Sequence, residues 1–220
     1  RAAGSRGGFA RRVRAAGSRG GISGARLRLI LKPGGDAGLL SGVLAAYASR
    51  PDARRVHILF SGAIDRVDYL RDGRADVGLL YVPLDDLDGL AHETLHVEGR
   101  VAILSAGHRL AGRSEVRLAD LAGESFPRWA DADVDRVARA TVADDGPEVA
   151  DVAQLLHLIA AGRMVAVLPR PLVEPVPLGI VLVPVAEAPP GRLVIAWRSH
   201  DLRPLVRHFV EAAVASIRRP

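Results

Sequence analysis

Beyond residue 26, the hydrophobic positions follow two different periods. Nearly continuous apolar runs stand at residues 27–32 (LRLILK), 56–60 (VHILF) and 77–82 (VGLLYV). The first two runs are each followed by a segment in which apolar residues recur every three or four positions. Continuous runs are typical of strands buried on both faces, and the longer period is typical of amphipathic helices. The pattern predicts strands that alternate with helices around a parallel sheet.

Three helices follow from this spacing. Asp36 can cap the first, over residues 37–50, whose apolar face consists of Leu39, Leu40, Val43, Leu44 and Tyr47. A short second helix carries Ile64, Val67 and Leu70 and stops at Gly73. The last, at 202–217, has the clearest stripe, formed by Leu202, Val206, Phe209, Val210, Ala213, Val214 and Ile217.

The pattern of hydrophobic positions changes after residue 90. HETLHVE (92–98) and RVAILSA (100–106) predict strands that cross out of the first unit, and FPRWA (126–130) predicts another strand. Helices are expected near 133–143 and at 151–161, the latter stopped by Gly162. The remaining strands are predicted at 165–169, 179–185 and 192–198. The chain is therefore expected to fold as two α/β lobes joined by crossing strands.

Charge is distributed unevenly along the chain. The octapeptide RAAGSRGG occurs at 1–8 and again at 14–21, and this Gly-rich stretch has no apolar periodicity, so residues 1–25 are predicted to be a flexible Gly/Arg-rich linker. Residues 1–35 hold eight arginines, Lys32 and no acid, a charge of +9. The whole chain carries +5, so residues 36–220 carry −4. The folded body therefore does not have the basic balance of a nucleic-acid-binding domain.

Composition excludes several kinds of chemistry. The sequence has no cysteine, which rules out disulfides and thiolate sites and favours a cytoplasmic protein. No apolar run approaches the roughly 20 residues of a membrane span. Among seven histidines only His92 and His96 share a local spacing, and four residues along a strand separate them by about 14 Å, too far to share a metal. No nucleophile elbow or P-loop is present. No metal, cofactor or catalytic set is predicted.

Loops that leave the carboxyl ends of parallel strands are where open α/β sheets hold ligands. Here these loops are 34–36, 61–63 and 81–83. The acids Asp85, Asp86 and Asp88 follow the third of them and are expected to lie in a solvated turn. The body is therefore predicted to bind a ligand without catalysing a reaction.

A set of motifs supports a family resemblance. The segments "LRDGRADVGLLYVP", "AGHRLAG", "ADLAGESF", "HLIAAG" with "VAVLP", and "RLVIAWR" occur in the order and spacing of the effector-binding domain of LysR-type transcriptional regulators, which the chain resembles over about residues 26–217. The resemblance implies a fold like that of type 2 periplasmic binding proteins, α/β with two Rossmann-like lobes around a cleft. Lobe one is expected at 26–100 plus 200–220, and lobe two at 101–199.

The resemblance also implies the effector-binding residues. They are Gly34, Gly35, Asp36, Ser61, Gly62, Ala63, Tyr81 and Val82 from lobe one, and Arg128, Trp129, Ala130 and Asp151 from lobe two. Asp36 stands at a helix start, where it would already occupy the position that an anion needs. We therefore expect a small polar effector with donor and acceptor groups in place of a simple carboxylate.

The expected partners follow the family pattern. The first is a small-molecule effector. The second is another copy of the chain, in a homodimer or tetramer through helix 37–50 and the predicted second strand, with apolar positions such as Leu40 and Val43. DNA is expected only through a helix-turn-helix domain that is absent from this chain. No membrane association is expected. Two other functions stay open: a solute-binding protein of a transporter, and an enzyme built on the same two-lobe fold.

Overall fold

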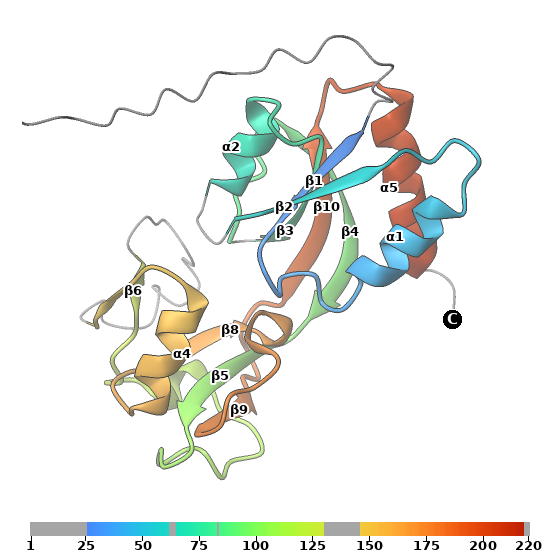
Figure 1. The fold of residues 1–220 in the computed structure, drawn as a ribbon. Coiled ribbons are helices and arrows are strands. Elements are labelled where there is room, and N and C mark those ends of the chain that lie inside the picture. Colours follow the sequence, from blue (N-terminus) through green and yellow to red (C-terminus); the bar gives the residue numbers. More distant parts are fainter. Residues whose placement is uncertain (1–25, 62–64, 83, 130–145, 218–220) are drawn as a thin grey trace, which may run out of the picture.

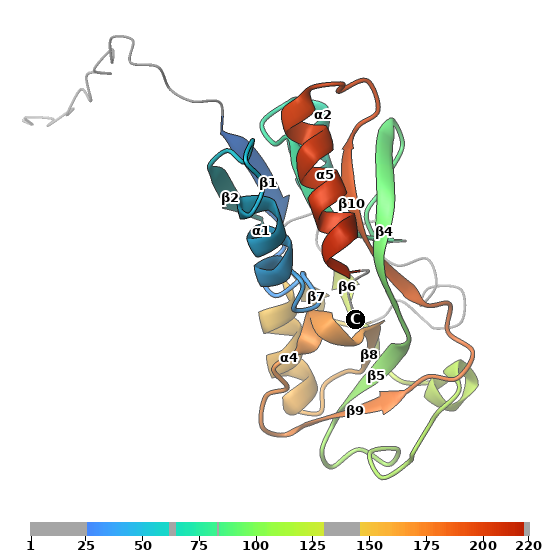
Figure 2. The same ribbon diagram turned by 90° about the vertical axis from the view of Figure 1, so that its right-hand side faces the viewer.

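The computed structural model describes residues 26–61, 65–82, 84–129 and 146–217. They form two lobes, connected by two chain segments that run between them (Figures 1 and 2). This arrangement confirms the predicted fold class. The predicted linker 1–25 and the helix expected near 133–143 lie outside the described residues.

The first lobe is built on a five-stranded sheet with the order β2-β1-β3-β10-β4. The first three strands are parallel, as the buried apolar runs predict, and β10 is antiparallel to both of its neighbours. Their bounds are β1 Leu27–Leu31, β2 Val56–Phe60, β3 Val77–Val82, β4 Leu90–Glu98 and β10 Gly191–Arg198. Because β10 belongs to this sheet, the predicted boundary that placed residues up to 199 in lobe two is wrong at this strand.

Helices cover both faces of this sheet. Helices α1 (Leu40–Ala48) and α5 (Pro204–Ile217) pack on one face around Tyr47 and Phe209. The two rings meet edge to face, with their centroids 5.0 Å apart. Helix α2 (Arg66–Arg71) covers the other face with Val67 and Leu70. Figure 2 shows α1 and α5 side by side on their face of the sheet. Burial of such apolar faces is the main stabilising contribution to the lobe.

Two helix boundaries differ from the sequence expectation. Helix α1 begins at Leu40 because residues 33–38 form turns that include glycines with positive φ at Gly34 and Gly38. Helix α5 begins at Pro204, so Leu202 precedes it and is 87% exposed. The remaining members of the predicted α5 stripe are buried or partly buried in the first-lobe core.

The second lobe contains a three-stranded antiparallel sheet with the order β8-β5-β9. Helix α4 (Val152–Ala160) packs on one face, and the short 3₁₀ helix η1 (Leu118–Leu121) packs on the other. A separate parallel pair, β6-β7, stands beside α4. The strands are β5 Arg100–Ser105, β6 Arg128–Trp129, β7 Glu148–Val149, β8 Ala166–Pro169 and β9 Ile180–Pro184.

The lobes are joined where β4 passes into β5 and β9 leads into β10, which confirms the predicted crossing strands. The buried guanidinium of Arg100 donates from Nε to the Pro189 carbonyl at 2.9 Å and so links the two crossing segments. The 3₁₀ helix η2 (Arg170–Val173) adds a further link, since Leu172 packs in the first-lobe core and Val173 in the second. None of the described helices is long and apolar enough to cross a membrane.

An ionic network lies at the amino-terminal end of the parallel strands. The Asp76 carboxylate, 1% exposed, accepts hydrogen bonds from the backbone and side chain of Arg28 and from Nη2 of Arg203 at 2.7 Å. Arg203 also pairs with Asp201, which binds Arg198. Burial opposes ionisation of Asp76, but the bonds from both arginines outweigh it and lower its pKa. Asp76 is therefore a structural anchor.

Candidate functional site

The first loop after β1 is held in a tight turn. Gly35 is buried and donates its amide to the Lys32 carbonyl at 2.9 Å. A Cβ on Gly35 would lie 3.0 Å from the Lys32 Cβ and 3.2 Å from the Lys32 oxygen, so a side chain there would displace Lys32. Gly34 has a φ of 70°, which L residues rarely adopt. The two glycines therefore fix where the Lys32 side chain leaves the strand.

Beside this loop lies a buried ion pair. Nη2 of Arg66 donates to Oδ1 of Asp85 at 2.9 Å, and Nη1 donates to the Ser61 carbonyl at 3.2 Å. Asp85 also accepts the Tyr81 amide at 2.8 Å and is 5% exposed. The expectation of a solvated turn is therefore wrong for Asp85. It holds for Asp86 and Asp88, which are exposed.

Lys32 completes this cluster. Its side chain is partly buried at the carboxyl end of β1, and no hydrogen bond or ion pair reaches it from the residues that the structure describes. Burial, followed by the positive charge of Arg66, lowers its pKa to about 8. Asp85 and Asp151 act in the opposite direction. Because Asp151 belongs to the second lobe, the Lys32 ammonium stands where charges of both lobes act on it.

The side chains of Tyr81 and Val82 lie on opposite faces of the first-lobe sheet. Tyr81 is 3% exposed and packs in the first-lobe core with its ring against the α1 and α5 side, so its side chain is not at an open surface. Its hydroxyl lies near the Glu98 carboxylate and Asp36, but neither that hydroxyl nor Oε1 of Glu98 has a hydrogen bond of normal geometry in the described structure. Burial raises the pKa of both groups. Val82 is partly buried on the α2 side of the sheet.

On the second lobe, β6 and α4 carry the remaining predicted site residues. Trp129 is partly buried against the α4 core, and Arg128 is exposed with Nε donating to the Gly146 carbonyl at 3.0 Å. Asp151 is the N-cap of α4 and accepts the Gln154 amide at 2.8 Å. Ser61 donates its hydroxyl to the Asp65 carboxylate. The predicted site residues Gly62, Ala63 and Ala130 lie outside the described residues.

Both helix starts named in the predicted site are occupied by carboxylates of the chain itself. Oδ2 of Asp36 accepts the Leu40 amide of α1 at 3.2 Å, and Oδ1 of Asp151 accepts from α4. A helix start binds anions through its free amides and its positive dipole end. With these carboxylates in place, an anion at the start of α1 or α4 would meet a negative charge.

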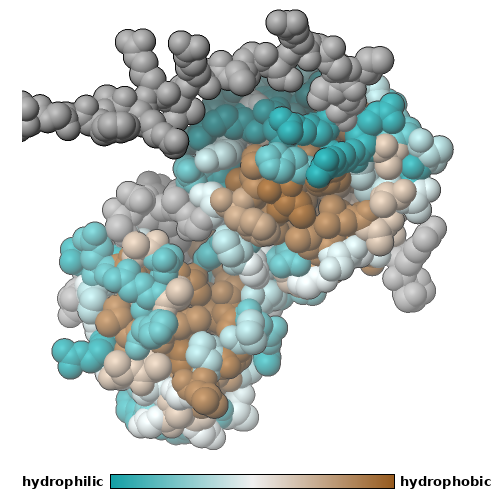
Figure 3. Space-filling model, in the orientation of Figure 1, coloured by the Kyte–Doolittle hydropathy of each residue, from teal (hydrophilic) through white to brown (hydrophobic). Residues whose placement is uncertain are grey.

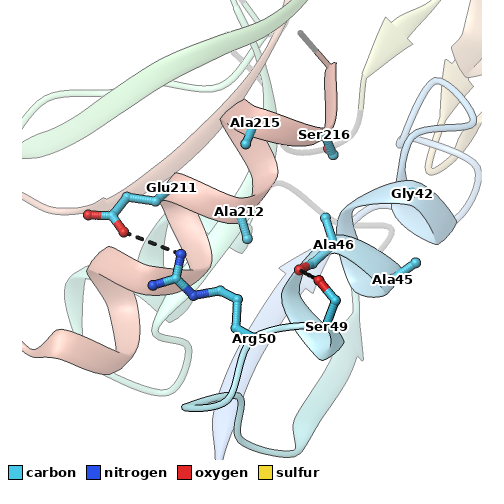
Figure 4. A pocket seen from close by; sticks show the side chains of 9 residues that line it. All are labelled: Gly42, Ala45, Ala46, Ser49, Arg50, Glu211, Ala212, Ala215 and Ser216. Atoms are coloured by element: carbon cyan, nitrogen blue, oxygen red, sulfur yellow. Dashed lines mark hydrogen bonds and ion pairs between the residues drawn. The ribbon is translucent and has the colours of Figure 1, made fainter. Parts of the chain in front are cut away.

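Two hollows accompany these elements. One, of about 560 Å³, lies between the first loop, including Gly34 and Asp36, and the chain at Pro171–Val176. The other, of about 500 Å³, is a groove between α1 and α5 floored by small residues such as Gly42 and Ala212 (Figure 4). Its hydroxyls at Ser49 and Ser216 donate to carbonyls of their own helices, and Arg50 pairs with Glu211 at 3.5 Å, so the polar groups of the groove are already engaged within the chain. No group of metal-binding side chains occurs within the described part of the chain.

Three residues of this cluster, Lys32, Arg66 and Asp85, were missed in the sequence-based site. Lys32 is the only lysine of the chain and directly precedes the Pro-Gly-Gly turn, a position at a strand end that could have marked it. Asp85 had no such signal, because nothing local to its acidic segment separates it from Asp86 and Asp88. Its partner Arg66 is 19 residues away in sequence.

Comparisons with known proteins agree with the two-lobe fold. The family model for the LysR substrate binding domain matches residues 20–218. None of the curated proteins compared with the chain matches it.

Solved structures show the same fold at low identity. The reduced form of OxyR superposes with a TM-score of 0.72 at 20% identity, covering 89% of this chain and 97% of that one. The reduced form of OxyR from N. meningitidis has a TM-score of 0.69 at 18% sequence identity, and the match covers 87% of this chain and 95% of that one. A full-length BenM mutant has a TM-score of 0.71 at 19% sequence identity, and the match covers 89% of this chain and 68% of that one. Two of these structures are described as reduced, whereas this chain has no cysteine and so cannot perform thiol redox chemistry.

Proposed function

Since the chain belongs to the LysR substrate binding domain family, we propose that it is the effector-sensing part of a LysR-type regulator and binds a small metabolite between its lobes. The regulator would contact DNA through a separate helix-turn-helix domain. The mildly acidic body supports this division, because residues 36–220 carry −4. We further propose that the ligand contacts come from the loops around Lys32, Ser61 and Asp151.

The charges at the cleft favour a neutral hydroxylated effector over a carboxylate. The starts of α1 and α4 already hold Asp36 and Asp151, which would repel an anion and can accept hydrogen bonds from ligand hydroxyls. Lys32 has no acceptor in the described structure, so it would donate to a ligand oxygen. The observation that carries this proposal is the unpaired Lys32 side chain between charges of both lobes.

Fluorescence titration tests this assignment. The two tryptophans are Trp129 and Trp197. Trp197 pairs with Val77 and Ala91 at the end of β10 away from the crossing at Gly191, so it reports the first-lobe core. In a Trp197→Phe variant, neutral hydroxylated metabolites should change Trp129 emission, whereas benzoate should not.

Substitutions locate the site. Lys32→Met should weaken binding about tenfold or more, since one charge-assisted hydrogen bond is lost. Lys32→Arg, which keeps the charge, is the matched control. If calorimetry detects a bound metabolite while Trp129 stays silent and neither Lys32→Met nor Arg128→Ala changes the affinity, the cleft is misplaced.

We also propose that two copies of the chain associate through α1 and β2. Strand β2 is an edge strand with Phe60 61% exposed, and Figure 3 shows apolar surface over β2 and α1. Leu40 is partly exposed, whereas Val43 is fully buried in the lobe core and cannot serve as the contact expected from sequence. An exposed apolar face of this kind is typical of an interface.

Sedimentation tests the association. The chain should sediment as a dimer at micromolar concentration, and Phe60→Asp should shift it to monomer. Val176→Asp, at an apolar residue that is also exposed but lies in the second lobe beside η2, is the control and should leave the dimer intact. A monomer at all concentrations would contradict the proposal.

A further inference from the structure

Three exposed arginines meet at the amino-terminal end of β1 and β2. Arg26 precedes β1, Arg54 and Arg55 precede β2, and the amide of Leu27 donates to the Arg55 carbonyl at 3.0 Å. In the described structure their guanidiniums make one hydrogen bond, at 3.5 Å from Arg54 to the Ala53 carbonyl, and no ion pair. We call these three residues the arginine corner.

The carboxylates at this end of the sheet do not balance the charge of the arginine corner. Asp52 already pairs with Arg50. Asp76 is shared by Arg28 and Arg203. The charge of −4 on residues 36–220 therefore includes a local excess of positive charge at this corner.

The basic character continues into the preceding chain. Of the eight arginines in residues 1–35, two are Arg26 and Arg28, so residues 1–25 carry six arginines, and they carry no acid. A polyanion that contacts the arginine corner therefore meets further positive charge in the segment joined to it. Guanidiniums are well suited to such a partner, because each can donate two parallel hydrogen bonds to one phosphate group.

We propose that the arginine corner contacts the phosphates of duplex DNA. This goes beyond the proposed effector function and rests on it only in that a regulator acts on DNA. Phosphate contacts carry no sequence information, so the corner adds affinity without sequence preference, and the reading of bases stays with the separate helix-turn-helix domain. The contact is electrostatic and weakens steeply with salt.

The salt dependence of DNA binding tests the proposal. The full chain is titrated into a fluorescein-labelled duplex of arbitrary sequence at several sodium chloride concentrations, and binding is followed by anisotropy. Each phosphate contact contributes about 0.9 to the slope of log affinity against log salt concentration. A variant with Arg54→Ala and Arg55→Ala should therefore lower the slope by about 2 and weaken binding at low salt by about tenfold. Both substitutions keep the backbone bonds to Tyr47 and Leu27, so the lobe should fold normally.

The matched control removes two exposed arginines from the second lobe, by Arg113→Ala with Arg163→Ala, and should leave the slope unchanged. Residues 1–25 are present in every protein compared, so their charge cancels in the difference. An unchanged slope in the corner variant, or an equal fall in the control, overturns the proposal. Binding of labelled polyglutamate with the same dependence on Arg54 and Arg55 overturns DNA as the partner and points to an acidic protein.

The effector function is tested separately in the same variants. Metabolites should change Trp129 emission equally in the corner variant and the control, because neither pair of substitutions touches the loops proposed to bind the effector. A lower DNA slope without any metabolite response supports the arginine corner and contradicts the effector function. A metabolite response with an unchanged DNA slope does the reverse.

Discussion

The two ends of the parallel strands in lobe one carry similar charges but use them differently. At the amino-terminal end, Asp76 accepts from Arg28 and Arg203, and every charge of the network has a partner. At the carboxyl end, Arg66 and Asp85 pair with each other, but Lys32 beside them has no partner in the described structure. The network at the amino-terminal end therefore pairs all of its charges without a ligand.

The difference separates a structural network from a binding site. A partly buried ammonium without a hydrogen-bonded partner is less stable than a paired one, so a ligand oxygen that accepts from it would be favoured there. The paired Arg66–Asp85 unit provides a rigid base for it. Loops at the carboxyl ends of strands are also where this type of fold places ligands.

The largest effect is expected at the base of the site. Asp85→Ala should lower the free energy of unfolding by about 4 kcal/mol, because it leaves the buried guanidinium of Arg66 without its carboxylate. The control is Asp86→Ala, which removes an exposed pair with Arg71 and should leave the free energy of unfolding nearly unchanged. Urea denaturation measures both. Equal effects of the two variants would mean that Asp85 is not buried.

A smaller loss is expected at the opposite end. Asp76→Ala should cost about 2 to 3 kcal/mol, since Arg28 and Arg203 lose their shared acceptor but are exposed enough to turn toward water. Asp72→Ala, which removes exposed contacts with the side chain and backbone amide of Arg74, serves as the control and should change stability much less than Asp76→Ala. Thermal and urea unfolding of the unsubstituted chain and the two variants measure these differences. A neutral Asp76→Ala would show that the network does not anchor the sheet.

Lys32 should make stability depend on pH. Its folded pKa is about 8 and its ordinary value is 10.5, so between these values the unfolded chain binds more protons and stability rises with pH. Relative to Lys32→Met, the chain should gain about 1 to 2 kcal/mol between pH 7.5 and pH 10, less than the full shift because the side chain is partly exposed. Other groups titrate in both proteins and cancel in the difference. A constant difference would mean that Lys32 has an ordinary environment.

The smallest effect is expected at Tyr81. Tyr81→Phe removes a buried hydroxyl that has no hydrogen bond of normal geometry in the described structure, so stability should change by less than about 0.5 kcal/mol. Tyr47→Phe is the control, because the Tyr47 oxygen accepts the Arg54 amide at 3.1 Å, and its removal should cost about 1 kcal/mol. Denaturant midpoints compare the two. A larger loss for Tyr81→Phe would reveal a bond to Glu98.

The sequence by itself determined the alternation of elements, the crossing strands and the family, because apolar periodicity and turn residues are local signals. Tertiary structure alone decided that Asp85 is buried while Asp86 is exposed, and that Val43 faces the core. It also brought Lys32 within electrostatic reach of Arg66 from one lobe and Asp151 from the other. These outcomes depend on residues that are distant in sequence and meet only when the sheet forms and the lobes pack. Burial and charge pairing are properties of that assembled arrangement, so no local pattern contains them.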